Sequence, residues 1–261
     1  MLELKSGHLI AKIDQGELVS FREKDHEYIH QKGDPGWGSS DTEMFPIIGP
    51  TAEADYKVLT PEGYSVQDQH GLLRAMHYEV ETHTETSAVY IKNYKANESI
   101  LNPKFPRKSK AEFMSWPYDF SFKKEYTLSE KGLQIDFLIS GPSGMPFMLG
   151  YHPAFKLKTS KPYVTSPTTE YILAQIMDVG DRAIHVPDCD SMVIHDAREL
   201  TIRSEGYGHF MLWSPARNMV CVEPVTFYPY DAPQDQLHKG FQTLSKGQKK
   251  FTVTLEVGKK G

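Results

Sequence analysis

Two residues that could exchange protons near neutral pH each stand immediately before a proline. His152 precedes Pro153 in the segment GYHPAF, and Glu223 precedes Pro224 in the segment VCVEP. Proline disfavours the α-helical region for the residue before it. Both backbones are therefore biased toward extended geometry, which narrows the directions that each side chain can take. This constraint suits a carboxylate and an imidazole that act as a fixed acid and base.

Each of these residues also has a purely structural interpretation. Glu223 follows the apolar run at 219–222, where a carboxylate costs free energy unless it is paired or functional. It could instead face solvent or form an ion pair with an arginine. His152 could be a hydrogen-bonded structural histidine. In a third polar segment, QHGLLR, His70 could close a turn and Arg74 could be a surface cation.

Other kinds of site have weaker support. His26 and His30 are four residues apart, but their segment has little helical character and precedes the turn-rich stretch KGDPGWGSS. The chain has no GxSxG nucleophile elbow, and Cys189 and Cys221 form no CxxC pair or recognisable nucleophile motif. We therefore predict no metal site, no cofactor and no serine or cysteine nucleophile, and expect both cysteines to be buried thiols.

The elements that must position these residues are mainly strands. Apolar residues recur at every second position over Leu133–Ile139 and Phe251–Val257, which indicates half-buried strands. Weaker alternation predicts further strands at Leu9–Ile13, Leu18–Phe21, Met76–Thr82, Val89–Tyr94 and Asp119–Phe122. The best helical candidate is short, around Asp235–Lys239, and no βαβ alternation is present. The pattern predicts an all-β antiparallel fold, either a sandwich or a barrel.

Composition limits the class of protein further. The chain has 261 residues, of which 39% are hydrophobic, and its composition does not shift along its length. We therefore predict one folded domain over residues 1–261. A net charge of −5 gives no basic field for a phosphate backbone, so nucleic acid is not an expected partner. Charges interrupt the N-terminal segment, and no apolar run reaches the ~18 residues of a membrane span, so we expect a soluble cytoplasmic protein without a membrane partner.

The three polar segments, together with others in the same order, resemble the aldose 1-epimerase (galactose mutarotase-like) family, and in particular its bacterial uncharacterised branch. The resemblance spans almost the whole chain. Its motifs are FPIIG (Phe45–Gly49), QHGLLRAMHYEV (Gln69–Val80), WPYDF (Trp116–Phe120), MPFMLGYHPAF (Met145–Phe155), VCVEP (Val220–Pro224) and the closing LSKGQKKFTVTLEV. Each motif is weak alone, but together in register they are fairly specific.

The resemblance implies a large antiparallel two-sheet β-sandwich, a choice that the alternation leaves open. It also implies an enzyme that interconverts the α and β anomers of a free aldose without cofactor or metal. Glu223 would be the general base that removes the proton from the C1 hydroxyl, and His152 the general acid that protonates the ring oxygen. His70 and Arg74 would bind the sugar. An unperturbed Glu pKa of about 4.3 and His pKa of about 6.5 suit these roles.

The sequence also departs from the family pattern. Pro50 stands where an arginine commonly follows the FPxxG glycine, and proline offers no donor for a sugar. The family's substrate-binding aspartate has no convincing counterpart, since Gly208 occupies the position that a GYDH-like pattern would give it. Val225 replaces the usual tryptophan after Glu223-Pro224. The acid and base are thus present, whereas the specificity contacts differ.

Four readings of the function remain open. The first is a mutarotase of a hexose or related aldose. The second is a carbohydrate-binding protein of the same fold with little or no catalysis, which Pro50 favours. The third is a mutarotase of a phosphorylated sugar, held by Lys104, Arg107 or Lys108 from the basic stretch Lys104–Lys110, which could otherwise be a solvated loop. The fourth is an adhesion module. The sequence predicts neither the sugar nor the oligomeric state.

Overall fold

The computed structural model describes residues 1–258, so the last three residues of the predicted domain lie outside the described part. Strands dominate it, as predicted, and α1 (Leu173–Asp178) is the single α-helix of residues 1–258. Five short 3-10 helices accompany it: η1 (Ala52–Ala54), η2 (Leu72–Ala75), η3 (Gly180–Arg182), η4 (Pro229–Asp231) and η5 (Gln234–Gly240). The predicted helical turn around Asp235–Lys239 is therefore a 3-10 helix. Among the described residues, no helix is long and apolar enough to span a membrane.

One layer of the fold is a nine-stranded antiparallel sheet. In spatial order it contains β18 (Glu170–Ile172), β17 (Tyr163–Thr165), β20 (Ser191–His195), β21 (Leu200–Glu205), β25 (Gln248–Val257), β13 (Gly132–Ser140), β12 (Phe120–Ser129), β9 (Ser87–Tyr94) and β8 (Glu79–His83). Its centre is the pair β13–β25, which are the two segments of strictest alternation. Phe137 lies opposite Phe251 in the register of this pair, and both are buried.

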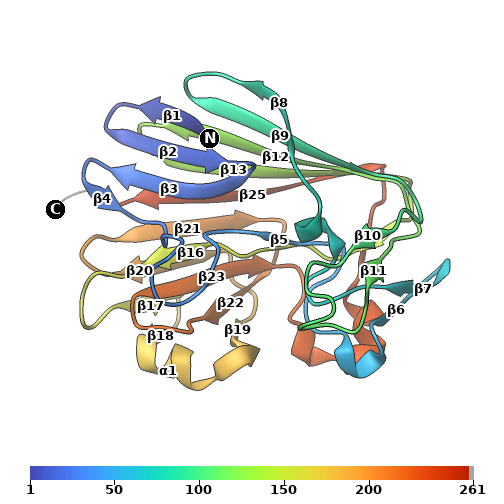
Figure 1. Ribbon diagram of the computed structural model, residues 1–261. Helices are drawn as coiled ribbons and strands as arrows, with labels where there is room; N and C mark the ends of the chain where they lie inside the picture. Colours follow the sequence, from blue (N-terminus) through green and yellow to red (C-terminus); the bar gives the residue numbers. More distant parts are fainter. Residues whose placement is uncertain (259–261) are drawn as a thin grey trace.

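Two smaller sheets form the second layer. The four-stranded sheet contains β1 (Leu2–Ser6), β2 (Leu9–Asp14), β3 (Glu17–Glu23) and β4 (His26–Glu27). The six-stranded sheet contains β19 (Ile184–Val186), β22 (His209–Trp213), β23 (Met219–Val225), β15 (Gly150–Tyr151) and β5 (Glu43–Met44), and β16 (Ala154–Lys156) also pairs with β23. A bridge between Ile29 and Phe155 joins the two sheets. Figure 1 shows β1–β3 packed against the long strands β12, β13 and β25. In the same view β22 and β23 lie below β1–β3.

Aromatic side chains fill the space between the two layers. The rings of Phe137 in β13 and Tyr151 in β15 lie 5.0 Å apart, and those of Phe122 in β12 and Phe45 lie 5.4 Å apart. Each buried ring contributes roughly 1.5–3 kcal/mol relative to an exposed one. The predicted two-sheet β-sandwich is thus confirmed, and the alternative of a barrel is wrong.

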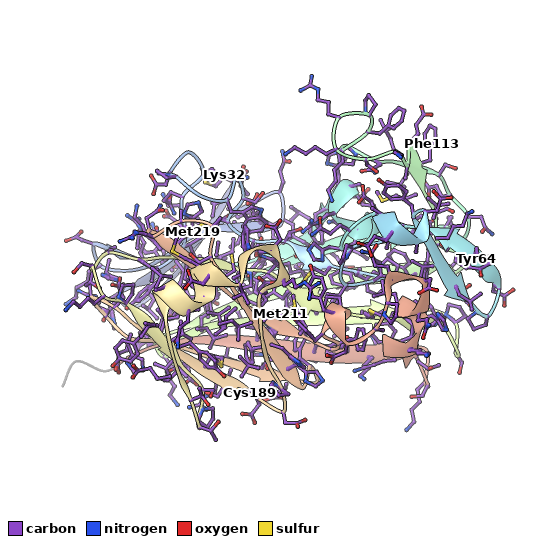
Figure 2. All side chains as sticks on the ribbon, turned by 90° about the horizontal axis from the view of Figure 1, so that it is seen from below. Lys32, Tyr64, Phe113, Cys189, Met211 and Met219 are labelled. Atoms are coloured by element: carbon purple, nitrogen blue, oxygen red, sulfur yellow. The ribbon has the colours of Figure 1, made fainter. Side chains whose placement is uncertain are left out.

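Short hairpins extend one end of the sandwich. They are β6 (Lys57–Thr60) with β7 (Gly63–Val66), and β10 (Ile100–Leu101) with β11 (Phe113–Met114). A further two-stranded sheet pairs β14 (Pro146–Phe147) with β24 (Gln242–Thr243), which are far apart in the sequence. The two hairpins pack with η1, η2 and η5 into what we call the side lobe, residues 45–76, 100–116 and 229–241. In Figure 2, Tyr64 and Phe113 mark this lobe, and Met211 of β22 lies toward the middle of the molecule.

Candidate active site

A cavity of about 410 Å³ lies between the side lobe and the six-stranded sheet. The residues that line it are Trp37, Gly49, Pro50, Gln69, His70, Arg74, Lys104, Lys108, His152, Asp181, Arg182, Ala183, Met211, Trp213, Glu223, Pro229 and Tyr230. The structure therefore brings all four predicted site residues, His70, Arg74, His152 and Glu223, to one cavity, although they are far apart in the sequence. We call it the site cavity.

A tight turn of the side lobe presents His70. Its φ of 70° and the φ of 79° at Gly71 are both left-handed. The backbone N–H of His70 donates to the carbonyl of Gly49 (3.1 Å), and the His70 carbonyl accepts from the N–H of Phe45 (3.1 Å). A Cβ on Gly71 would lie 2.2 Å from the carbonyl oxygen of Phe45, so only glycine fits there. This explains the His-Gly pair, and η2 then carries Arg74 to the cavity wall.

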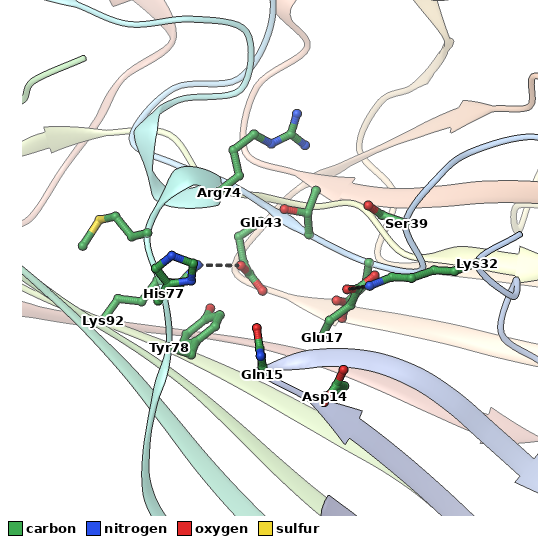
Figure 3. A pocket seen from close by; sticks show the side chains of 14 residues that line it. Asp14, Gln15, Glu17, Lys32, Ser39, Glu43, Arg74, His77, Tyr78 and Lys92 are labelled. Atoms are coloured by element: carbon green, nitrogen blue, oxygen red, sulfur yellow. Dashed lines mark hydrogen bonds and ion pairs between the residues drawn. The ribbon is translucent and has the colours of Figure 1, made fainter. Parts of the chain in front are cut away.

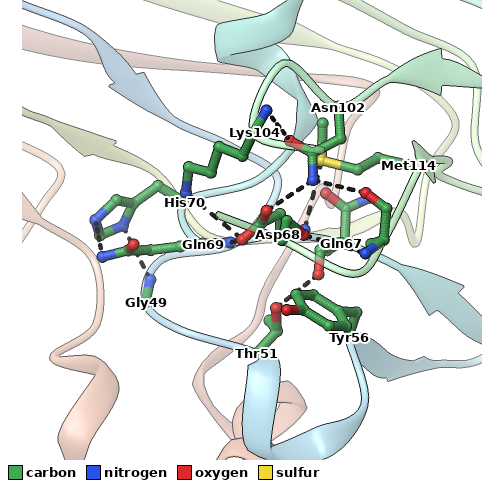
Figure 4. Close-up of polar contacts among 12 residues, drawn as sticks. Gly49, Thr51, Tyr56, Gln67, Asp68, Gln69, His70, Asn102, Lys104 and Met114 are labelled. Carbon is green, nitrogen blue, oxygen red and sulfur yellow. Dashed lines mark hydrogen bonds and ion pairs between the residues drawn. The ribbon is translucent and has the colours of Figure 1, made fainter. Parts of the chain in front are cut away.

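The hydrogen bonds of His70 fix its tautomer. Its Nδ1 accepts the backbone N–H of Gly49 at 3.1 Å, so the neutral ring carries its proton on Nε2, which lies 3.3 Å from the side-chain amide of Gln69 (Figure 4). Burial, and then the positive charge of Arg74, lower its pKa well below the ordinary value. His70 is therefore a neutral donor at physiological pH, and it can offer Nε2–H to an oxygen atom of a ligand.

His152 follows β15 and projects into the cavity from the edge of a sheet. Its backbone exchanges two hydrogen bonds with Thr42, of 2.8 and 3.2 Å, which extends the β5–β15 pairing. The preceding residue, Tyr151, points the other way, into the core. The imidazole lies 4.3 Å from the Trp37 ring and 5.8 Å from the Trp213 ring. The extended backbone that Pro153 favours is thus built into a strand edge.

Glu223 lies within β23, and its side chain is 2% exposed. It pairs in register with Met211 of β22, and both side chains line the cavity. The Oε1 atom of Glu223 is 3.5 Å from Nε2 of His152. This is slightly long for a hydrogen bond but close enough for the two groups to act on neighbouring atoms of one ligand. The structural interpretation that Glu223 faces open solvent is wrong.

Burial changes the protonation of this pair. It raises the pKa of Glu223 to about 8, and the nearby Arg74 opposes that rise. Burial and the charge of Arg74 also lower the pKa of His152 to about 3. At pH 7 the free site therefore holds one transferable proton, on the carboxyl group, and a neutral imidazole. The order of the two pKa values is thus the reverse of their order in water, where the histidine has the higher one.

The same region holds the one group of three close potential metal ligands in residues 1–258. Ligand atoms of His152, Cys221 and Glu223 lie within 4.8 Å of one another. Burial raises the pKa of the Cys221 thiol well above its usual value, so a metal would have to displace that proton and the Glu223 proton. His30, whose spacing from His26 gave only weak support for a metal site, is buried with its Nε2 2.8 Å from the Trp37 carbonyl oxygen.

A second cavity, of about 510 Å³, lies on the other side of Arg74 (Figure 3). Its wall is strongly charged and includes Glu17, Lys32, Glu43 and Lys92. Lys92 Nζ is 3.9 Å from Glu43 Oε2, and both side chains are almost completely buried. Ionised groups here are already paired with one another. The uncommitted acid and base are in the site cavity.

Several residues of the site cavity were not predicted or were left open. Asp181 and Arg182 of η3 and Tyr230 of η4 come from short surface segments without periodic signal. Of the three tryptophans that could stack on a sugar, Trp37 and Trp213 line the cavity, while Trp116 is fully buried in the core.

The departures from the family pattern have distinct positions. Pro50 lies in the cavity wall, so the missing arginine leaves its place to an apolar side chain. Gly208 does not line the cavity, whereas Asp181 does. Lys104 and Lys108 of the basic stretch also reach the cavity, and Arg107 does not.

Comparisons with known proteins bear on the family and the fold. A family model described as aldose 1-epimerase matches residues 16–188. The structure is similar to that of a galactose mutarotase-like protein from Lactobacillus casei, with a TM-score of 0.81, 18% identity and coverage of 99% of this chain and 100% of that one. It is also similar to a galactose mutarotase related enzyme from Lactobacillus acidophilus (TM-score 0.73, 19% identity, 99% of both chains). An aldose epimerase homologue from C. elegans matches with a TM-score of 0.69 and 12% identity over 98% of both chains.

A search of curated protein sequences gave no match. The structural similarities establish the fold, and the family model covers more than half of the sequence. The chain belongs to the aldose 1-epimerase family.

Proposed function

We propose that the protein is a mutarotase that interconverts the α and β anomers of an aldose. The observation that carries this proposal is the distance of 3.5 Å between Glu223 Oε1 and His152 Nε2 at the wall of a cavity lined by polar donors and tryptophans. Mutarotation needs one group that takes a proton and one that gives a proton, at two oxygens bonded to the same carbon. A pair with one transferable proton meets that requirement.

In the proposed reaction, Glu223 accepts the proton of the C1 hydroxyl while the bond between C1 and the ring oxygen breaks. His152 donates a proton to the ring oxygen, which leaves an open-chain aldehyde. Rotation about the C1–C2 bond followed by the reverse steps yields either anomer. In the reverse steps Glu223 returns its proton to the C1 oxygen, and His152 regains a proton from the hydroxyl that closes the ring. His70 Nε2–H and the Arg74 guanidinium would bind sugar oxygens and stabilise the charge that develops on them.

The pKa values add one condition to this scheme. The free site has its proton on Glu223, which is the state that follows ring opening. For the cyclic sugar to react, that proton must first pass to His152. A sugar bound in the opposite orientation would instead let protonated Glu223 serve the ring oxygen directly. A crystal structure of Glu223→Gln with a sugar bound would show which oxygen faces which residue.

The activity test is the decay of optical rotation of freshly dissolved α-glucose and α-galactose, with and without protein. We expect acceleration by the wild type and a loss of about 10²–10⁴-fold in kcat for Glu223→Gln and for His152→Asn, the usual contribution of a positioned acid or base. Matched controls are Glu79→Gln and His83→Asn on β8, whose side chains are all exposed.

The same series tests the second candidate, a carbohydrate-binding protein with little catalysis, which the apolar Pro50 in the cavity wall favours. Sugar binding by the wild type without acceleration over the spontaneous rate, across a panel of aldoses and their 6-phosphates, would establish that candidate. Full activity of Glu223→Gln would contradict the assignment of Glu223.

A further inference from the structure

The rim of the site cavity carries an unusual concentration of positive charge. Four of its residues are cationic, Arg74, Lys104, Lys108 and Arg182, and two are acidic, Asp181 and Glu223. Glu223 is largely protonated at neutral pH because burial raises its pKa to about 8. The chain as a whole has 34 acidic and 29 basic residues. The charge of the cavity therefore has the opposite sign to the charge of the molecule.

Lys104 is fixed rather than freely mobile. Its Nζ is 3.5 Å from Oδ1 of Asp68, which is almost completely buried. Asp68 in turn accepts hydrogen bonds from Asn102 Nδ2 at 2.7 Å and from the backbone N–H of Gln69 at 2.5 Å. Figure 4 shows this network next to the turn that presents His70. The basic loop is thus anchored to the segment that carries a predicted sugar-binding residue.

The cations on this wall repel one another. Burial lowers the pKa of Lys104, and the neighbouring charges of Arg74 and Lys108 lower it further, while Asp68 opposes these effects. The Lys108 side chain is exposed, but its backbone N–H donates to the Lys104 carbonyl at 2.8 Å, so the loop folds back and turns both residues to the cavity. An anion placed between these cations would relieve the repulsion.

Arg182 faces the cavity from a different element, η3. Its guanidinium carbon lies 5.4 Å from the centre of the Tyr230 ring, and the Tyr230 hydroxyl donates to the Asp181 carbonyl at 3.3 Å. These contacts hold η3 against η4 at the edge of the cavity. The Asp181 carboxylate lies beside Arg182 and offsets part of the positive charge. The cavity wall thus carries four cationic side chains against the one carboxylate of Asp181 and the largely protonated Glu223, and the carboxylate that pairs with Lys104 lies outside the cavity.

We propose that the natural substrate is an aldose that carries an anionic group, phosphoryl or carboxylate, at the end of the molecule away from C1. Lys104, Lys108 and Arg182 bind that group, while C1 lies at Glu223 and His152. Guanidinium and ammonium groups are the usual ligands of phosphate and carboxylate in proteins. This inference rests on the proposed mutarotase function and specifies its substrate class.

The test compares kcat/KM for three sugars, glucose, glucose 6-phosphate and glucuronate, with anomer exchange followed by NMR. We expect the wild type to prefer one of the charged sugars, and the preferred one identifies the anionic group. Single changes Lys104→Met, Lys108→Met and Arg182→Met should each lower the ratio of charged to neutral kcat/KM by about tenfold, the effect of one charge-assisted hydrogen bond. Arg107→Met is the matched control, since Arg107 belongs to the same loop but not to the cavity.

Equal or higher kcat/KM for glucose, or an unchanged ratio in all three variants, would overturn the proposal. A binding experiment separates this failure from failure of the mutarotase function. Glucose 6-phosphate and glucuronate are titrated calorimetrically into Glu223→Gln, alone and combined with Lys104→Met and Lys108→Met. Binding of a charged sugar that the two lysine changes weaken supports the anionic site even without catalysis. Binding that they leave unchanged refutes it, whatever the catalytic result.

Discussion

Replacement of Lys124 by methionine tests how the strand that holds His152 is fixed. Lys124 belongs to β12 and is completely buried, with its Nζ 2.7 Å from Asp41 Oδ2 and 2.7 Å from Glu43 Oε1. The Tyr151 hydroxyl donates to the same oxygen of Asp41 at 2.7 Å. The ion cluster thus clamps the segment 41–43 onto the opposite sheet. Thr42, in the middle of that segment, makes both backbone hydrogen bonds to His152.

The expected cost of Lys124→Met follows from these contacts. Methionine keeps most of the side-chain volume but leaves Asp41 without a cationic partner and Glu43 with only the more distant Lys92. Breaking a buried ion pair in this way typically costs about 3–5 kcal/mol of unfolding free energy. In a protein of this size the melting temperature should fall by roughly 6–15 °C. The control is Lys123→Met, because Lys123 and its partner Glu81 are 36% and 40% exposed, and such a pair contributes less than about 1 kcal/mol.

The pH dependence of the loss identifies its cause. Burial already raises the pKa of Asp41 to about 6, although Lys124 opposes that rise, and without Lys124 the pKa of Asp41 rises further and that of Glu43 rises as well. Their ionisation then destabilises the folded state at neutral pH and less so as the pH falls toward about 4. Urea unfolding at pH 8 and at pH 5 should therefore show a smaller deficit at pH 5. The triple variant Asp41→Asn, Glu43→Gln, Lys124→Met should recover part of the stability, since it buries no unpaired charge. Equal costs for Lys124→Met and Lys123→Met, or a deficit that grows at pH 5, would refute this reasoning.

Two further outcomes follow from the site. Mutarotase kcat/KM should stay constant through neutral pH and decline as the pH rises through about 8, because Glu223 and His152 together lose their one transferable proton there. A decline centred near the ordinary pKa of histidine would contradict this assignment. Gly71→Ala should lower both the activity and the free energy of unfolding, since its Cβ would lie 2.2 Å from the carbonyl oxygen of Phe45. The control is Gly63→Ala, because Gly63 also has a positive φ but has open space around it. This variant should lose only the roughly 1–3 kcal/mol of backbone strain. Comparable losses in the two glycine variants by urea unfolding would show that the turn can move aside.

Local alternation predicted the strands well, because the burial pattern of a strand follows the order of apolar and polar residues within that strand. The segments Leu133–Ile139 and Phe251–Val257 lie within β13 and β25. Alternation carries no information about pairing, so their adjacency at the centre of the large sheet could not be predicted from the pattern. The predicted strand Met76–Thr82 begins too early, since η2 continues to Ala75 and β8 starts at Glu79. Helix α1 was missed because a helix of six residues shows too few turns to establish a period.

The buried position of Lys124 could have been predicted from the sequence. Alternation along β12 places Phe122, Lys124 and Tyr126 on one face, and that face is buried. Continuing the predicted strand at Asp119–Phe122 by two more pairs would have set a charged residue inside the core, a position that requires a partner. Its partners Asp41 and Glu43 come from a loop and a two-residue strand, which give no comparable signal.

The two halves of the site differ in the same way. His70, Arg74, His152 and Glu223 could be predicted through the resemblance of their segments to the aldose 1-epimerase family, since each residue alone also had a structural interpretation. Asp181, Arg182 and Tyr230 could not, because they stand in short 3-10 segments where any polar residue is tolerated on the surface. The predicted site residues thus stand in segments with a local sequence signal, and the other cavity residues in short surface segments without one.

The position of the cations at the cavity rim is therefore evidence about the ligand. Solvated lysines and arginines on exposed loops are ordinary, and in a chain of net charge −5 they would be expected to spread among acidic neighbours. Lys104, Lys108 and Arg182 instead come from two unrelated segments and meet at one opening, with Arg74 behind them. Lys104 contacts Asp68 and Arg182 stacks on Tyr230, but these contacts fix each segment separately and do not require the cations to meet. A ligand of opposite charge is the one partner that all of them can share.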